Sequence, residues 1–217
     1  MVCDTREEAT VDVQTEPMTP EIGEEDALRA DLYDFLSALL SRPPRADLLA
    51  RTRALSGDET PLGQAFATLA KLAGQATEAS VEREFNRLFI GVGRGELLPY
   101  ASYYMTGFLN EKPLAALRQD MARRRIARAP NVFEPEDNMA SLCESMAGLI
   151  RGRFGAVASL PDQRAFFNRH LAPWAAHFFT DLEGAKTSVF YAPVGVIGRI
   201  FMGIERDAFR MIGESGT

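Results

Sequence analysis

Residues 139–150, Met-Ala-Ser-Leu-Cys-Glu-Ser-Met-Ala-Gly-Leu-Ile, carry the most regular pattern in the chain. Three acids and an asparagine stand just before them in Glu134-Pro-Glu-Asp-Asn138. Acidic side chains at this position can cap free N–H groups and interact favourably with the helix dipole. The pattern therefore predicts a helix that begins after these acids. Its apolar residues recur at the spacing of one helix face: Met139, Leu142, Cys143, Met146, Leu149 and Ile150.

Apolar residues recur with the same helical period in segments before and after this helix in the sequence, and each such set is called a stripe. Pro43-Pro44 ends one of them, Pro61 suits the first turn of another, and Pro173 is expected to kink or split a third. No stretch alternates convincingly between apolar and polar residues. The sequence therefore predicts a single all-α domain, a helical bundle of roughly eight to ten helices. The further stripes fall at 28–39, 48–55, 62–73, 81–89, 100–109, 114–121, 166–178 and 194–208.

Acidic residues are concentrated at the N-terminus. The 217 residues have a net charge of −6, yet residues 1–26 contain nine acids and one arginine. The remainder is nearly neutral, unlike the strongly basic body of a general nucleic-acid binder. Residues 1–22 offer too little apolar surface to offset the entropy of ordering. We expect a disordered acidic tail over 1–22 and a helical domain over 23–217.

Composition also excludes several protein classes. The longest charge-free stretch, Leu97–Asn110, has 14 residues, whereas a membrane-spanning helix needs about 20. The acidic first residues contain no apolar leader segment. Cys3 and Cys143 form neither a disulfide framework nor a zinc pattern, and no Glu-x-x-His motif precedes His170 or His177. We therefore expect a cytoplasmic protein without membrane insertion, metal or cofactor.

Two segments leave other functions open. Gly91-Val92-Gly93-Arg94-Gly95 has the composition of a phosphate-binding loop, but it follows a helical stretch and precedes no Lys-Ser/Thr pair. Glycines there also suit a helix stop and a hinge. A nucleotide-hydrolysing protein using Gly91, Gly93, Arg94 and Gly95 is one alternative. Five arginines within residues 118–128 form either a solvated face or a patch for an acidic partner, so a helical nucleic-acid-binding regulator is another.

Four motifs occur in order along the chain. They are Glu82-x-x-Phe85-x-x-Leu88-Phe89, Gly91-x-Gly93-Arg94-Gly95-Glu96, Pro99-Tyr100-x-Ser102-x-Tyr104 and Glu134-Pro135-x-Asp137-Asn138. Together they resemble the TorD/DmsD/NarJ family of redox-enzyme maturation chaperones, over about residues 28–212. Two C-terminal motifs are similar to the branch found beside formate dehydrogenase: Phe167-x-x-His170-Leu171-x-Pro173-Trp174 and Gly198-Arg199-x-Phe201-Met202.

The resemblance implies an all-helical, cytoplasmic protein that has no catalytic activity of its own. Its implied partners are the catalytic subunit of a molybdopterin oxidoreductase and that subunit's twin-arginine signal peptide. The chaperone would hold this client until its cofactor is inserted, before export or assembly. Formate dehydrogenase is the suggested client, and chain exchange within the family makes a homodimer a further partner. The expected peptide-binding residues are Phe85, Leu88, Phe89, Pro99, Tyr100, Ser102, Tyr104, Glu134, Pro135, Glu136, Asp137 and Asn138.

The physical needs of such a receptor agree with these residues. Two guanidinium groups call for carboxylates, which Glu134, Glu136 and Asp137 are expected to supply. The apolar segment that follows calls for a hydrophobic groove. Phe85, Phe89, Tyr100 and Tyr104 are expected to supply it, although the stripe of Phe85, Leu88 and Phe89 also predicts core. Asn138 stands where the family usually has histidine, so hydrogen bonding is retained but an ionisable ring is not.

Overall fold

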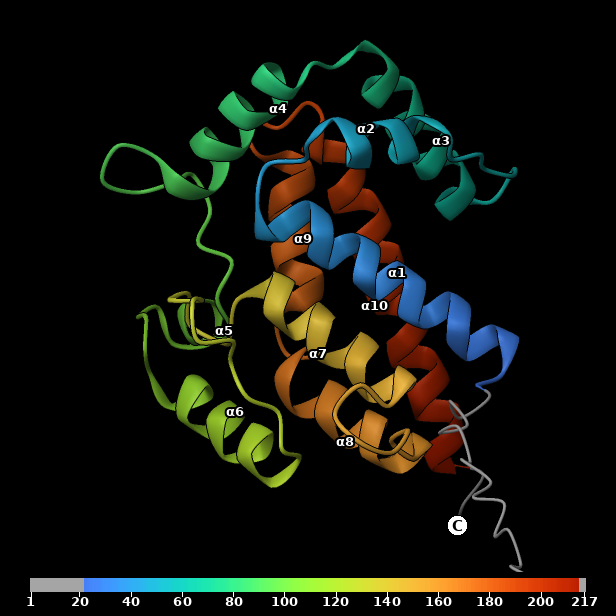
Figure 1. Ribbon diagram of the computed structural model, residues 1–217, viewed down its shortest axis with the longest axis vertical. Coiled ribbons are helices and arrows are strands. Elements are labelled where there is room, and N and C mark those ends of the chain that lie inside the picture. The colour runs from blue at the N-terminus through green and yellow to red at the C-terminus, as the bar shows by residue number, and fades with distance from the viewer. Residues whose placement is uncertain (1–21, 215–217) are drawn as a thin grey trace, which may run out of the picture.

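The computed structural model describes residues 22–214 and confirms the all-α prediction. These residues form ten α-helices and one π-helix, without a strand (Figure 1). Except for Ile22, the predicted acidic tail lies outside the described residues. The helices are α1 (Glu24–Ser41), α2 (Ala46–Arg53), α3 (Pro61–Gln75), α4 (Glu78–Phe85), η1 (Asn86–Ile90), α5 (Ala101–Thr106), α6 (Lys112–Arg123), α7 (Met139–Arg151), α8 (Leu160–His170), α9 (Ala175–Gly184) and α10 (Tyr191–Glu214).

Most helix ends follow local chemistry that the sequence shows. Asn138 caps α7, because its side-chain oxygen accepts a hydrogen bond of 2.9 Å from the N–H of Ala140. Pro173 lies in the break between α8 and α9, as predicted. The aromatic helix predicted over 100–109 is shorter than expected. It ends at Thr106 because Gly107 takes the left-handed conformation, with φ of 83°.

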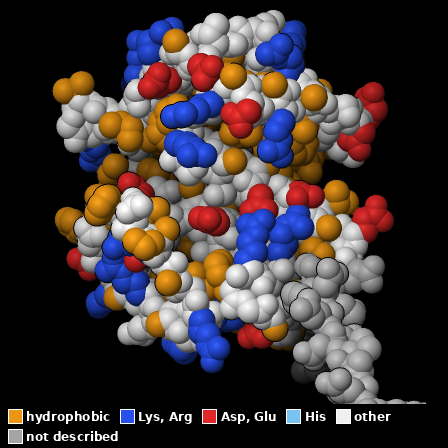
Figure 2. Space-filling view, viewed as in Figure 1, with side chains coloured by type: hydrophobic (Ala, Val, Ile, Leu, Met, Phe, Trp, Pro, Cys, Tyr) orange, Lys and Arg blue, Asp and Glu red, His pale blue; other side chains and the backbone are white. Residues whose placement is uncertain are grey.

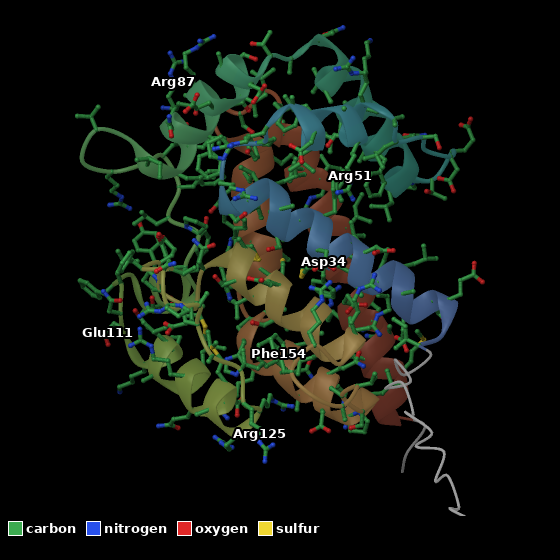
Figure 3. The ribbon with its side chains drawn as sticks, in the orientation of Figure 1. Asp34, Arg51, Arg87, Glu111, Arg125 and Phe154 are labelled. Carbon is green, nitrogen blue, oxygen red and sulfur yellow. The ribbon has the colours of Figure 1, made fainter. Side chains whose placement is uncertain are left out.

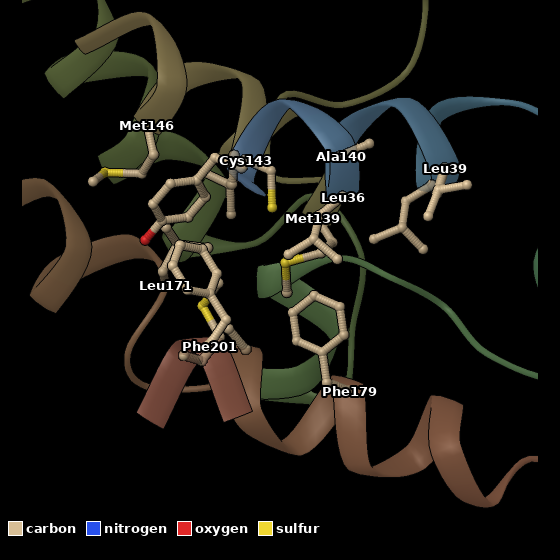
Figure 4. Close-up of a cluster of buried hydrophobic side chains, with 14 of the residues drawn as sticks. Leu36, Leu39, Met139, Ala140, Cys143, Met146, Leu171, Phe179 and Phe201 are labelled. Carbon is tan, nitrogen blue, oxygen red and sulfur yellow. The ribbon is translucent and has the colours of Figure 1, made fainter. Parts of the chain in front are cut away.

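The core lies between α7 and the helices on either side of it. In Figure 4, Leu36 and Leu39 of α1 face Met139 and Cys143 of α7 across a closely packed layer, and all four side chains are fully buried. Each buried side chain of this size contributes about 1.5–3 kcal/mol relative to exposure. At the same crossing, the partly exposed Asp34 of α1, labelled in Figure 3, pairs with Arg151 at the end of α7 and with Arg153 just after it.

The loop 91–99 links α4 and η1 to the lower helices α5 and α6 (Figure 1). Gly91 ends η1 with φ of 61°, and a Cβ there would lie 1.9 Å from the carbonyl oxygen of Arg94. Two carboxylates fix this region to the segment before α10. Glu84 accepts the N–H groups of Val189 and Tyr191 at 2.7 and 2.9 Å, and Glu96 accepts that of Lys186 at 2.6 Å. These bonds set the position of η1.

Close packing of α9 against α10 depends on a glycine. A Cβ on Gly195 would lie 2.5 Å from the backbone nitrogen of Glu183, whereas a Cβ on Gly203 of the same helix meets nothing within 4 Å. We expect Gly195→Ala to lower the free energy of unfolding by about 1–3 kcal/mol. Gly203→Ala should raise it by about 0.5–1 kcal/mol. Urea unfolding followed by circular dichroism measures both, and equal stability of the two variants would contradict the packing argument.

Candidate functional site

An acidic, partly aromatic groove crosses the molecule between α1, η1 and the N-terminus of α7. It consists of a hollow of about 270 Å³ and a second hollow of about 190 Å³. The two share Val132, Glu134, Ser141 and Glu144, so both glutamates stand where the hollows meet. We call this feature the acidic groove. Its apolar walls come from Leu40, Phe85, Phe89, Ile90, Pro99 and Tyr100 on one side and Met121, Ile126 and Phe154 on the other.

The π-helix η1 forms the aromatic wall. This π-helix continues α4. Its last hydrogen bond runs from the N–H of Gly91 to the carbonyl of Asn86, with a donor–acceptor distance of 2.6 Å. The rings of Phe85 and Phe89 meet edge to face, with centroids 4.9 Å apart. Leu88 is completely buried and belongs to the core, while Ile90 is 59% exposed beside the groove. Of the predicted residues in this segment, Phe85 and Phe89 line the groove and Leu88 does not.

Two of the predicted acids line the groove, Glu134 in both hollows and Glu136 in the second, and of these only Glu134 is without an ion pair among the described residues. The hydroxyl of Tyr100 donates a hydrogen bond to its carboxylate. Partial burial of this carboxylate raises the pKa of Glu134. The side chain remains accessible at the mouth of the groove, and no basic side chain among the described residues forms an ion pair with it. Glu134 therefore presents an acceptor for a cation from outside.

Glu144 is a second groove carboxylate, and it was not predicted from the sequence. It lies on the exposed face of α7, between the buried Cys143 and Ser145. It lines both hollows, and no described residue donates a hydrogen bond to it. The sequence does show that Glu144 lies on the solvent-facing side of the helix whose apolar residues begin after Glu134. Because periodicity identifies the buried face, it does not show which exposed residue borders a groove.

The other acids of the 134–138 segment are held by the protein itself. Glu136 forms ion pairs with Arg118 at 2.9 Å and Arg128 at 3.8 Å. Burial opposes ionisation of Glu136, but these arginines outweigh it and lower its pKa. Asp137 is 1% exposed, and its Oδ2 accepts the N–H of Ser102 at 2.8 Å. Glu134 therefore lines the groove without an ion pair, Glu136 lines the second hollow but is held by arginines, and Asp137 is buried, before Asn138 caps α7.

The side chains of the segment 99–104, which contains three tyrosines, also differ in whether they line the groove. Tyr100 lines the groove and forms the isolated β-bridge with Asn138. Ser102 is fully buried. Tyr104 donates a hydrogen bond of 2.9 Å to Asp181 and packs against Trp174, with centroids 5.3 Å apart. Of this segment's predicted peptide-binding residues, only Pro99 and Tyr100 line the groove. Pro135 shapes the turn, since its carbonyl accepts the N–H of Asn138 at 3.2 Å.

The two alternative functions gain little support from this geometry. The Gly91–Gly95 loop follows α4 and η1 instead of a strand, and Arg94 stacks on Tyr103 at 5.1 Å. Most arginines of 118–128 are paired with acids: Arg118 and Arg128 with Glu136, Arg123 with Asp120, and Arg124 with Asp162. A nucleic-acid patch needs free cations for phosphates, and these pairs reduce their number.

No group of three or more His, Cys, Asp or Glu side chains among the described residues is placed to hold a metal ion. No described helix combines the length and apolarity that a membrane crossing requires. His170 is buried and shares a hydrogen bond of 2.7 Å with Asp120. Burial lowers the pKa of His170 despite this bond, and Arg169 and Arg124 add to the effect.

Comparisons with known proteins agree on one family. A family model described as the nitrate reductase delta subunit matches residues 56–180. The chaperone protein TorD of Aliivibrio fischeri is 28% identical over 209 residues, which cover 86% of this chain and 95% of that protein. TorD of Vibrio cholerae is 28% identical over 170 residues, covering 69% and 77%.

A solved structure shares the fold. It is a redox enzyme maturation protein from Archaeoglobus fulgidus, which matches with a TM-score of 0.52 at 19% identity and covers 87% of this chain and 99% of its own. The names of these relatives agree with the prediction of a chaperone instead of an enzyme. The chain belongs to the nitrate reductase delta subunit family, the TorD/DmsD/NarJ group of redox-enzyme maturation chaperones that its motifs resemble.

Proposed function

We propose that this maturation chaperone binds the twin-arginine signal peptide of a molybdopterin oxidoreductase in the acidic groove. The observation that carries the proposal is the placement of Glu134 and Glu144 where the two hollows meet. Neither carboxylate lies within ion-pair distance of a described arginine or lysine, unlike Glu136, although Arg153 interacts with Glu144 electrostatically at longer range. Two carboxylates without a close cation, beside an aromatic wall, match a ligand with two cations followed by an apolar segment.

The geometry supports arginine as the cation. A guanidinium presents several N–H donors in a plane and pairs with carboxylates through two parallel hydrogen bonds. Tyr100 fixes one side of the Glu134 carboxylate, which reduces the entropy lost when a guanidinium binds. Phe89 is half-buried and Ile90 is exposed, so both have surface that an apolar peptide segment would cover. Glu136 also lines the second hollow, but Arg118 and Arg128 already neutralise it. Asp137 is buried. The proposed cation contacts are therefore Glu134 and Glu144 alone.

The remaining parts of the proposal follow from the sequence motifs. The client is a formate dehydrogenase, held in the cytoplasm until its cofactor is inserted and before export or assembly. Residues 1–22 form an acidic tail attached to a binding domain over 23–217, and a homodimer is a further assembly of this chain. None of these statements is needed for the acidic groove to bind an arginine pair.

Calorimetry with a synthetic signal peptide tests the proposal. The probe is the leader of the formate dehydrogenase catalytic subunit from the same organism, compared with leaders in which both arginines are changed to glutamine or to lysine. Replacing each arginine by glutamine should weaken binding roughly 10–150-fold, the equivalent of about 1.5–3 kcal/mol for a charge-assisted contact. The lysine leader should bind with intermediate affinity. Equal affinity of all three leaders would rule out arginine recognition in the groove.

A further inference from the structure

A basic hollow adjoins the acidic groove at the end of α1. It has a volume of about 510 Å³ and is bordered by the last turn of α1, the Pro43-Pro44 link and α2. We call it the arginine hollow, because Arg42, Arg45 and Arg51 line it. All three side chains are exposed. Figure 2 shows Lys and Arg side chains gathered over this part of the molecule, and Figure 3 labels Arg51.

The arginines of the hollow have no partner within the described part of the chain. None of the three forms an ion pair or a side-chain hydrogen bond there. Arginines elsewhere pair with acids, as Arg118 and Arg128 do with Glu136. Asp47 is the only acid among the described residues that line the hollow, so three arginines against one acid leave its walls with a charge of +2. A concave surface with an excess of one sign of charge attracts a ligand of the opposite sign.

The last turn of α1 separates this hollow from the acidic groove. Ser37 and Leu40 line the acidic groove, whereas Ala38 and Arg42 line the arginine hollow. Ser41 lines both, so the two features are neighbours on one surface. A ligand that crosses Ser41 therefore meets carboxylates on one side and guanidinium groups on the other.

This change of sign favours a polypeptide as the ligand. A nucleic acid carries negative charge along its whole length, so Glu134 and Glu144 would repel the part of it that lay in the groove. A polypeptide can place arginines and acidic residues within a short stretch, and its charge then changes sign where that of the surface does.

The spacing of the arginines favours several carboxylates over a single anion. Arg45 immediately precedes α2, and Arg51 lies in its last turn. Because an α-helix rises 1.5 Å per residue, these two positions are about 9 Å apart along the helix axis. An extended polypeptide places every second side chain about 6.6 Å further along, so two or three acidic residues span the hollow.

We propose that the arginine hollow binds an acidic stretch of the same client polypeptide whose arginine pair lies in the acidic groove. The inference rests on the proposed function and adds a charge pattern to it: the preferred client carries two or more glutamates or aspartates close to its arginine pair. Arg42, Arg45 and Arg51 contact this stretch, and Ser41 marks the junction between the two sites. The chaperone thereby distinguishes among leaders that all contain an arginine pair.

Peptide binding to the full-length protein tests this charge pattern. Three fluorescent probes share an Arg-Arg pair with an apolar segment after it. The reference probe has three glutamines on each side of this core, whereas the other two have three glutamates either before it or after it. One of the glutamate probes should bind roughly 5–30-fold more tightly than the reference, since each exposed ion pair contributes modestly. This gain should shrink as salt rises, and equal affinity of all three probes would overturn the proposal.

Variants of the hollow locate the gain. In the triple variant Arg42→Gln, Arg45→Gln and Arg51→Gln, the glutamate probe should lose its advantage while the reference probe keeps its affinity. Arg53→Gln is the matched control, because Arg53 is an exposed arginine of the same helix that does not line the hollow. This control should retain the gain. Full retention of the gain in the triple variant would disprove the site.

Two further measurements distinguish other occupants. At matched ionic strength, phosphate should displace the glutamate probe no better than chloride, and displacement by phosphate alone would reassign the hollow to a phosphate ligand. Residues 1–21 of the chain also contain acids. If the gain appeared only after those acids were changed to amides, the hollow would bind the chain's own N-terminus and the proposal would be wrong. Failure of the proposed function gives a different result, since a probe with glutamines in place of its arginines would then bind as tightly as the reference.

Discussion

Changing both Glu134 and Glu144 to glutamine is expected to reduce affinity for a twin-arginine leader by roughly 10²–10⁴-fold. Each substitution keeps the size of the side chain but removes its charge, and each charge-assisted hydrogen bond contributes about 1.5–3 kcal/mol. The two carboxylates line the same hollows, so their effects need not be additive. Calorimetry with the wild-type leader measures the double variant and both single variants.

Two controls make this result specific. Glu59→Gln removes the same charge from an exposed position before α3 and should leave affinity unchanged. Glu136→Gln removes an acid that Arg118 and Arg128 already neutralise and should have a much smaller effect than either groove substitution. If Glu136→Gln abolished binding and the double variant did not, the leader would bind at Glu136 in the second hollow instead of at Glu134 and Glu144.

The pH dependence of leader binding provides a second measurement of Glu134. Its pKa is raised by partial burial, so the carboxylate takes up a proton earlier than an exposed glutamate as the pH falls. Affinity should be full above that pKa and weaken below it, because the protonated group no longer attracts a guanidinium. A bound arginine favours the ionised form, so binding near this pKa releases a proton. In Glu134→Gln, this part of the proton release should disappear.

The helical framework could be predicted because its signals are local. The stripe at 139–150 and the break at Pro173 each depend on neighbours a few residues away, and each appears where expected. The cap of α7 is Asn138 and not one of the three acids expected there. The aromatic helix ends three residues before its predicted end, because Gly107 takes the left-handed conformation of a C-cap.

The division of the acids could not be predicted in the same way. Glu134, Glu136 and Asp137 lie within four positions, yet their directions depend on partners distant in sequence. Arg118 and Arg128 hold the second, and Ser102 holds the third. Because residues 134–138 show no periodic pattern, their spacing does not assign any of these side chains to a buried or an exposed face. The same limit explains why Glu144 was not predicted, since its role depends on α1 and η1 closing over the first turns of α7.

Removing the buried carboxylate of Glu205 is expected to cost about 3–5 kcal/mol of unfolding free energy. Glu205 lies on α10, is 1% exposed, and accepts hydrogen bonds from Arg29 at 2.7 and 2.9 Å and from Tyr33 at 2.9 Å. Arg29 also contacts Gln163 of α8 at 3.2 Å. The carboxylate joins α10 to α1, and Arg29 extends the contact to α8. Glu205→Ala leaves the buried hydroxyl of Tyr33 without its acceptor and leaves the partly buried guanidinium with Asp26 and Gln163 alone.

Asp34→Ala is the matched control for this prediction, because it removes another α1 ion pair at a more exposed place (Figure 3). It should cost about 1 kcal/mol or less. A second comparison separates the contribution of the Arg29–Glu205 ion pair from the cost of leaving one buried charge unpaired. In Arg29→Met combined with Glu205→Leu, neither charge remains, so much of the lost stability should return. Urea unfolding at neutral pH measures all three variants. A Glu205→Ala protein as stable as Asp34→Ala would show that the α1–α10 contact is held by apolar packing alone.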